Sequence, residues 1–200
     1  MKRVFIIFIL VLIVIGVVGG SYAHYQQLKV EEALEAADSK QLSTILNRPF
    51  IQMENSWMDT AVNQYDVTSA LILFEHDVPI SDEQWMYLAD LMTFKEFEQM
   101  VVAGAPLEIA TSSQTLVEGL YSLNDEPEKW RFAHEAINPS FFNEHPTILF
   151  RAVYDGNTEA FLDVLERMDH HAVPYDALVP LIQESGQTEM LEAITNKMNV

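Results

Sequence analysis

The chain has 200 residues, of which 49% are apolar and 20% are charged, as in globular rather than disordered proteins. Its 11 Lys and Arg are outnumbered by 30 Asp and Glu, and the net charge of -19 repels nucleic-acid phosphates, so we expect no nucleic-acid binding. Because the chain has no Cys, a disulfide framework, a thiolate zinc site and a cysteine nucleophile are excluded.

The N-terminal segment is strongly apolar and follows a basic pair. Residues 4–18 are all apolar or Gly, and they come directly after Lys2 and Arg3. Extended to Ala23, the segment (residues 4–23) has about the twenty residues that a helix needs to cross a hydrocarbon core of roughly 30 Å. The pattern predicts that residues 1–23 are a transmembrane anchor. A signal peptide cleaved near Ala23 is the alternative, because small residues there suit a signal peptidase.

The charges that flank this segment predict its orientation. Lys2 and Arg3 precede it and only Lys29 follows closely, so the positive-inside rule keeps the N-terminus in the cytoplasm. We therefore expect a single-pass inner-membrane protein whose C-terminal domain, residues 24–200, lies in the periplasm. Cleavage near Ala23 would instead give a soluble periplasmic protein. That domain holds 9 Lys and Arg against 30 acids, a charge of -21.

A helix-turn-helix pattern is clearest at residues 147–165. Apolar residues at 148, 149, 152 and 153 predict a short helix, and those at 161, 162, 164 and 165 predict a second one. Between them, Gly156 suits a left-handed turn and Asn157 can cap the second helix. The segment is therefore expected to be an antiparallel helix pair.

This unit resembles an ankyrin repeat, whose first helix opens with the pattern T-P-L-H-x-A. Thr147, Leu149 and Ala152 match that pattern, while Ile148 and Phe150 stand in place of its Pro and His. The resemblance implies an all-α solenoid, in which each helix pair buries its apolar face against the next.

Two further segments resemble the end of the second ankyrin helix and the turn that follows it. They are residues 101–107, with Gly104 in the turn, and residues 73–80, with Asp77 where the family usually has Gly. Pro79 and Pro106 stand close to the next expected helices, so the long loops of ordinary ankyrin repeats are expected to be shortened here.

The turns between paired helices recur at a nearly constant spacing. They are expected at Asp38, Asp66, Thr93, about Asp125, Gly156 and Gly186, which are 28, 27, 32, 31 and 30 residues apart, against about 33 in ankyrin repeats. The chain is thus predicted to be all-α, with an N-terminal transmembrane or signal helix followed by an ankyrin-like helical-hairpin solenoid of about five to six helix pairs over residues 24–200.

The sequence offers little catalytic chemistry. It has no G-x-S-x-G elbow, no H-E-x-x-H and no phosphate-binding Gly-rich loop. Residues 169–171 (Asp-His-His) and 75–77 (Glu-His-Asp) hold metal-ligand types, but adjacent helical residues point about 100° apart and rarely converge on one ion. We therefore expect no enzyme activity, no metal and no cofactor.

Acidic residues dominate the middle of the chain. Residues 49–128 include fifteen acidic residues but a single basic one, Lys95. Such a surface would steer a basic protein partner towards it, although plain solubility explains the charge equally well. The candidate partner-binding residues are Glu75, Asp77, Asp82, Glu83, Glu108, Asp125, Glu126 and Glu128.

The expected function is protein binding in the periplasm. An acidic, membrane-tethered binding protein suits an immunity protein that neutralises a toxic effector with a basic surface. The alternative is a tethered ankyrin scaffold that supports a periplasmic enzyme or an envelope complex. Both expectations extend from fold to function by analogy.

Overall fold

The computed structural model describes the backbone of residues 2–49, 51–121 and 126–199, with side chains from residue 19 onward within those ranges. This part of the chain is all-helical, as predicted, and contains no strand beyond one isolated antiparallel bridge between Ala110 and Thr115. The turn expected near Asp125 lies outside the described residues. The chain divides into two compact units, Met1–Ile80 and Ser81–Val200.

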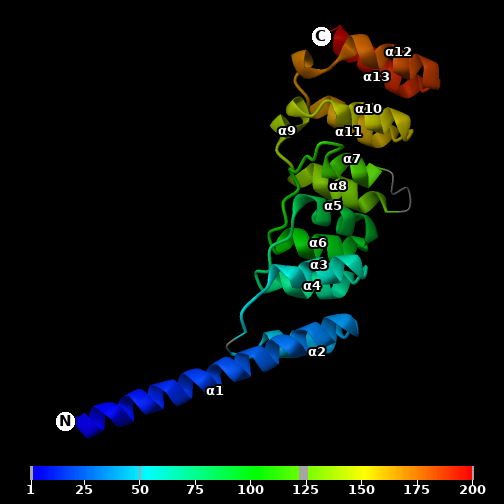
Figure 1. Cartoon of the computed structure of the whole chain (residues 1–200). Helices are drawn as coiled ribbons and strands as arrows, with labels where there is room; N and C mark the ends of the chain where they lie inside the picture. Colours follow the sequence, from blue (N-terminus) through cyan, green and yellow to red (C-terminus); the bar gives the residue numbers. More distant parts are fainter. Residues whose placement is uncertain (1, 50, 122–125, 200) are drawn as a thin grey trace. The chain divides into compact units, whose positions relative to one another are not determined.

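The first unit consists of two helix pairs (Figure 1). Helix α1 (Lys2–Glu35) packs against α2 (Ser39–Leu46), and α3 (Asn55–Asn63) packs against α4 (Val67–Glu75). Apolar side chains near the end of α1 are buried together with those of α2, and α1 contacts α3 while α2 contacts α4. These buried residues are Val30, Ala33, Leu34, Leu42, Ile45 and Leu46.

The expected anchor falls inside α1, which continues without a break past residue 23. The side chains of residues 1–18 lie outside the described part of the chain. Within the part that is described, no helix combines the length and the apolar character that crossing a membrane requires.

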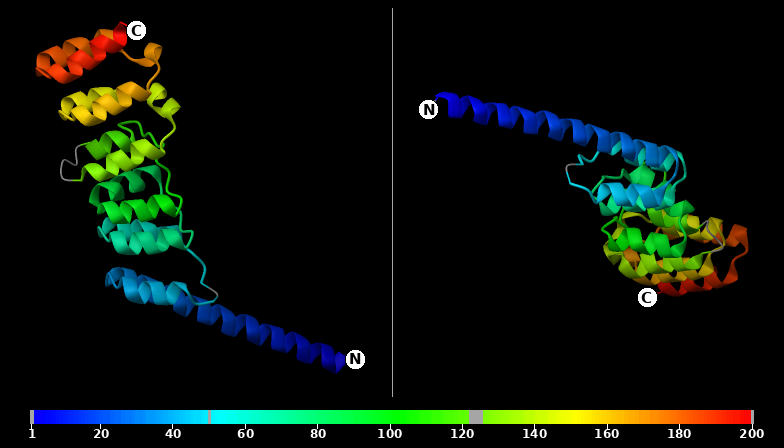
Figure 2. Two further views of the ribbon diagram at one scale, coloured as in Figure 1. Left: turned by 180° about the vertical axis from the view of Figure 1, so that it is seen from behind. Right: turned by 90° about the horizontal axis from the view of Figure 1, so that it is seen from below.

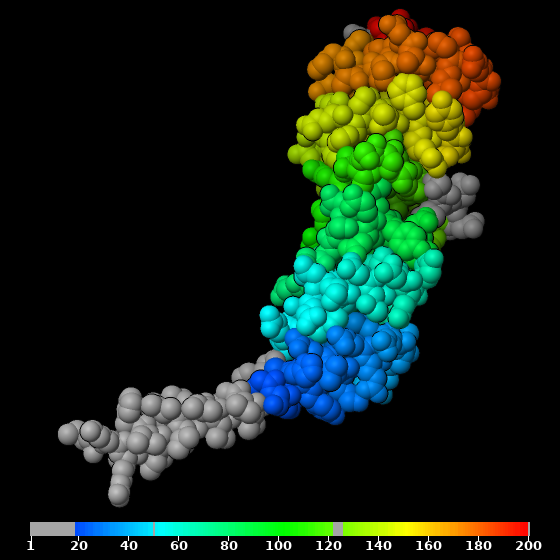
Figure 3. Space-filling model, in the orientation of Figure 1, coloured from blue at the N-terminus to red at the C-terminus, as the bar shows by residue number. Residues whose placement is uncertain are grey.

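The described residues of the second unit form four successive helix pairs and one additional short helix (Figures 1 and 2). Helices α5, α7, α10 and α12 form one layer, since each contacts the next, and α6, α8, α11 and α13 contact one another in the same order in a second layer. In Figure 3 the α10 and α11 pair, in yellow, lies between α7 and the orange α12 and α13 pair. The bounds are α5 Asp82–Leu91, α6 Phe94–Val102, α7 Leu116–Tyr121, α8 Pro127–Ala136, α9 Pro139–Glu144, α10 Thr147–Tyr154, α11 Thr158–Arg167, α12 Tyr175–Ser185 and α13 Thr188–Met198, with a 3-10 turn at His170–Ala172.

The turns inside four of these pairs share one backbone conformation. In each, a left-handed residue with φ of 50 to 71° precedes an N-cap residue with φ of -90 to -83° and ψ of 78 to 85°. The N-cap N–H donates to the carbonyl five residues earlier, which satisfies a free carbonyl at the end of the preceding helix. The four turns are Ala37–Asp38, Tyr65–Asp66, Gly156–Asn157 and Gly186–Gln187.

These turns confirm four of the positions that the sequence spacing predicted. As expected, Gly156 is left-handed and the Asn157 side chain accepts a hydrogen bond from the Ala160 N–H at 3.0 Å. A fifth predicted turn, at Thr93, has a different form: Thr93 and Glu96 make a reciprocal capping box at the start of α6.

The connections between pairs follow the predicted pattern only in part. Asp77 and Gly104 are both left-handed, with φ of 62° and 109°, so Asp77 does occupy a position that glycine favours. The expected shortening is wrong after α6, where residues 103–115 form a long connection that is closed by the Ala110–Thr115 bridge. Pro106 lies at the start of this loop, and its carbonyl accepts a hydrogen bond from the Trp85 indole at 2.7 Å.

Candidate functional site

The predicted partner-binding acids are divided between the two units. In the first unit Glu75 is the last residue of α4 and Asp77 lies in the turn behind it, and both are exposed. In the second unit Asp82 and Glu83 form the exposed first turn of α5. Glu75 and Asp77 thus belong to the first unit, and Asp82 and Glu83 belong to the second.

Three of the remaining predicted acids, Glu108, Glu126 and Glu128, lie near the ends of α8. Glu108 is exposed and its Oε1 accepts a hydrogen bond from the Asn138 N–H at 2.7 Å, just beyond the C-terminal end of α8. Glu128 is exposed in the first turn of α8, about 15 Å from Asn138 along the chain at 1.5 Å per residue. Glu126 pairs with the buried Lys129 at 2.6 Å, and Asp125 lies outside the described residues.

A groove between α5 and α7 collects one predicted acid with several residues that were not predicted. It has a volume of about 350 Å³. Glu83, Tyr87 and Asp90 contribute to it from one face of α5, at the i, i+4, i+7 spacing. Apolar side chains and polar loop residues complete the lining, namely Met86, Leu116, Leu120, Thr111, Ser113 and Gln114. A groove with carboxylates, an aromatic ring and apolar side chains suits a long cationic side chain.

The loop that borders this groove is held by its own hydrogen bonds. The Thr111 N–H donates to the Gln114 carbonyl at 2.9 Å, and the Leu116 N–H donates to the Ile109 carbonyl at 3.1 Å. At the start of α7 the buried Glu118 carboxylate accepts from the Thr115 N–H at 2.6 Å, which completes a capping box. The polar side of the groove is therefore fixed in position.

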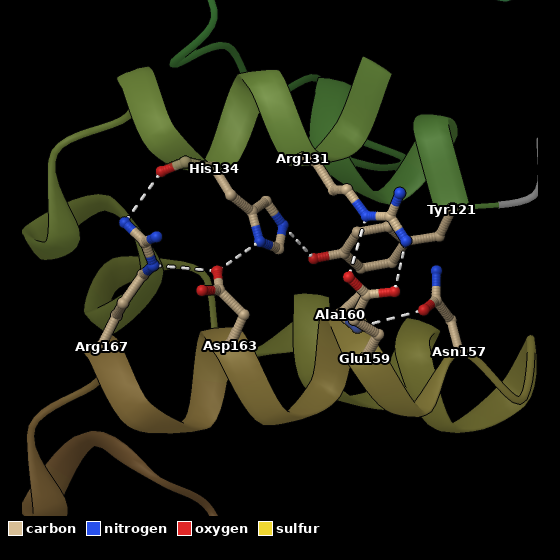
Figure 4. Close-up of polar contacts among 8 residues, drawn as sticks. All are labelled: Tyr121, Arg131, His134, Asn157, Glu159, Ala160, Asp163 and Arg167. Atoms are coloured by element: carbon tan, nitrogen blue, oxygen red, sulfur yellow. Dashed lines mark hydrogen bonds and ion pairs between the residues drawn. The ribbon is translucent and has the colours of Figure 1, made fainter. Parts of the chain in front are cut away.

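A second polar cluster joins successive helix pairs through a buried histidine (Figure 4). The Tyr121 hydroxyl at the end of α7 lies 2.6 Å from Nε2 of His134 on α8. Nδ1 of His134 lies 2.7 Å from Oδ2 of Asp163 on α11. Arg167 closes the cluster, because its Nε donates to Asp163 at 2.8 Å and its Nη1 donates to the His134 carbonyl at 3.0 Å.

The cluster carries a defined pattern of protons. Burial raises the pKa of the Tyr121 hydroxyl well above 10, so the phenol stays protonated at neutral pH. Partial burial works to raise the pKa of Asp163, but hydrogen bonds from His134 and Arg167 outweigh it and lower that pKa below its usual value. A carboxylate only accepts hydrogen bonds, so Nδ1 of His134 carries a proton.

The geometry of this cluster favours a structural joint over a reaction centre. Tyr121 and His134 are each only 1% exposed, and the polar side-chain atoms between them are already hydrogen-bonded. Next to it, Arg131 forms a two-bond ion pair with Glu159, at 2.8 and 2.6 Å. This pair lowers the pKa of Glu159, although both side chains are largely exposed and the pair contributes little stability.

The sequence contained one overlooked signal for this cluster. His134 and Asp163 are 29 residues apart, and Arg131 and Glu159 are 28 apart, close to the spacing of the repeated turns. Polar residues separated by one repeat occupy equivalent places in adjacent pairs, so they can meet directly. The spacing would have singled out His134, but only if its helix had been recognised as equivalent to α11.

The sequence clusters at residues 75–77 and 169–171 gather no further metal ligands among the residues that the structure describes. Among the described residues, no group of three or more His, Cys, Asp or Glu is arranged to hold a metal ion. Instead, the Asp169 carboxylate accepts a hydrogen bond from the Asn143 side chain at 2.8 Å.

Comparison of the chain with protein-family models, curated proteins and solved structures finds no match.

Proposed function

We propose that this chain is a membrane-anchored, ankyrin-like α-solenoid that binds a basic protein partner in the periplasm. The solenoid proposal is supported by the common turn conformation at Asp38, Asp66, Asn157 and Gln187. The ordered contacts within each layer of the second unit also support it, because repeats of a solenoid contact only their neighbours. Solenoids of this kind generally serve as binding surfaces rather than as enzymes.

The acidic groove between α5 and α7 is the observation that carries the binding proposal. A Lys or Arg side chain of the partner would lie along the Tyr87 ring with its charge between Glu83 and Asp90. Of the nine basic residues after residue 24, seven make contacts within the chain. Few basic side chains therefore remain to neutralise the exposed acids. A basic partner would be attracted over a distance of about a Debye length, ~8 Å at physiological salt.

The biological role that we favour is immunity. A protein that must neutralise a toxic effector in its own compartment gains from fast, charge-steered capture and from a tether at the membrane where damage occurs. The partner's basic surface would be covered by the acidic groove, and its activity would be blocked.

The test is capture of the partner from native cells followed by association kinetics with the purified pair. We expect Glu83→Lys with Asp90→Lys to slow association at least tenfold at low salt, because two attractive charges become repulsive at the groove. Glu184→Lys, at an exposed site on α12, is the matched control and should change association little. Equal association rates for the groove variant and the wild type at low salt would refute the groove.

The role is decided by the identity of the partner and by deletion. If the captured protein kills cells that lack this chain, immunity is supported. If deletion lowers the activity of a harmless periplasmic enzyme, the chain is a scaffold and immunity is refuted.

A further inference from the structure

The first helix pair carries a basic groove, unlike the acidic groove described above. The groove lies along α1 and α2 and has a volume of about 470 Å³. Lys29, Lys40 and Arg48 line it, together with Tyr25, Gln41 and Thr44. Asp38 also lines it and Glu32 pairs with Lys29, so the cations outnumber the nearby carboxylates by one. The hollows of the second unit described here, at α5–α7 and α8–α11, have the opposite balance.

The cations lie along both walls of this groove. On the α2 side Lys40 and Thr44, four residues apart, lie on one face of the helix, and Arg48 lies just beyond its end at Leu46. On α1, Tyr25 and Lys29 have the same four-residue spacing. The groove is therefore bordered by cations and hydrogen-bond donors along its length, an arrangement that fits an anionic phosphate.

The groove begins close to the end of the proposed anchor. Helix α1 is continuous, so at about 1.5 Å per residue Tyr25 lies roughly 3 Å and Lys29 roughly 9 Å beyond Ala23 along the helix axis. The Arg48 guanidinium donates to the Gln26 side chain at 3.0 Å, which holds it near the same level. The headgroup layer of a bilayer is about 5 to 8 Å deep on each side, so Arg48 and the flexible Lys29 would reach it.

Exposed aromatic and apolar side chains occur on the same stretch of α1. Tyr22, Tyr25 and Leu28 are 41, 53 and 49% exposed. Tyrosine is enriched at membrane interfaces, where its ring meets the acyl chains and its hydroxyl meets the headgroups. Exposed apolar surface of this kind is unfavourable in water and would be buried favourably at a bilayer surface.

We propose that the groove formed by Tyr25, Lys29, Lys40 and Arg48 binds the phosphate of an anionic phospholipid headgroup at the membrane surface. This site rests on the proposed anchoring of α1 and is independent of partner binding at α5 and α7. It would hold the first helix pair against a membrane that repels the rest of this acidic chain.

The test uses the full chain in lipid nanodiscs of phosphatidylcholine, with or without phosphatidylglycerol. An amine-reactive reagent labels exposed lysines, and mass spectrometry follows each site. We expect phosphatidylglycerol to slow labelling of Lys29 about fivefold, from about 1 kcal/mol per cation near the surface, and to slow Lys40 less because it lies further from the anchor. Lys95, exposed on α6, should react at the same rate in both discs. Arg48→Gln should weaken the protection of Lys29.

Four outcomes would overturn the proposal. Equal labelling of Lys29 in both discs would show that no anionic lipid binds there, and equal slowing of Lys29 and Lys95 would indicate a general charge effect. Protection of Lys29 by inorganic phosphate in phosphatidylcholine discs alone would assign the groove to a free anion. A chain that does not co-purify with discs would refute the anchor, while leaving the kinetics of the Glu83 and Asp90 variant unaffected.

Discussion

The hydroxyl of Tyr121 is the best single place to test the joint between successive helix pairs. Tyr121→Phe removes only that oxygen and leaves Nε2 of His134, which is 1% exposed, without a partner. An unpaired buried polar group costs about 1 to 3 kcal/mol. Taking the middle of that range, we expect the free energy of unfolding of the second unit to fall by about 2 kcal/mol and its melting temperature to fall by about 6 °C.

The measurement is thermal unfolding of the full chain followed by far-ultraviolet circular dichroism, with Tyr175→Phe as the control. Tyr175 also has a buried hydroxyl, but no hydrogen-bond partner for it is present among the described residues. The same chemical change should therefore leave stability equal or slightly higher. Opposite signs for the two variants would isolate the hydrogen bond from the general effect of removing a phenol oxygen.

An unchanged melting temperature for Tyr121→Phe would refute this reasoning. A double-mutant cycle with His134→Gln adds a second criterion, since residues in one hydrogen-bond network show coupling of about 0.5 to 3 kcal/mol. Strict additivity of the two changes would mean that Tyr121 and His134 do not stabilise the fold together.

Three further predictions concern charge and backbone conformation. Because the pKa of Asp163 is lowered in the folded state, its stabilising contribution is present above about pH 4, the pKa of an unfolded Asp, and is lost as pH falls through the lower folded pKa. Asp163→Asn should therefore flatten the dependence of the free energy of unfolding on pH in this range. Parallel curves for the variant and the wild type from pH 7 to 2 would contradict this. Gly156→Ala should lower the free energy of unfolding in urea by about 1 kcal/mol, because φ at this position is +66°. The control Gly119→Ala, inside α7 and without a strained φ, should leave stability unchanged or raise it. Equal effects of the two changes would argue against the left-handed turn. Glu126→Gln should destabilise by about 2 kcal/mol by leaving the buried ammonium of Lys129 unpaired, while Lys129→Met should cost much less, and the reverse order in the same assay would disprove the pairing.

The sequence predicted the features that depend on local chemistry. The turns at Asp38 and Asp66 were predictable because a carboxylate accepts N–H groups of the following helix, and Gly156 because glycine adopts a left-handed conformation without strain. Helices α7 and α8 lie on either side of the turn expected near Asp125, although no ankyrin pattern marks them. The all-helical fold follows from such signals repeated along the chain.

The features that depend on contacts between pairs were not predicted. The joint of His134 with Asp163 requires two helices to be aligned in space, and no local pattern records that alignment. The groove residues Tyr87 and Asp90 were missed for a similar reason, because the long loop that completes the groove was expected to be short. Whether the predicted acids bind a partner stays a prediction, and Glu126 already pairs with Lys129.

The unbroken course of α1 has a mechanical consequence for the protein. Because one helix runs from Lys2 to Glu35, any rotation of its N-terminal part about the helix axis is transmitted to the first helix pair. Removing one residue between Ala23 and Gln26 would turn that pair by about 100° and draw it about 1.5 Å along the axis, whereas removing about seven would restore its direction. In the proposed anchored form, helical phase rather than distance alone would therefore set which side of the first helix pair faces the bilayer.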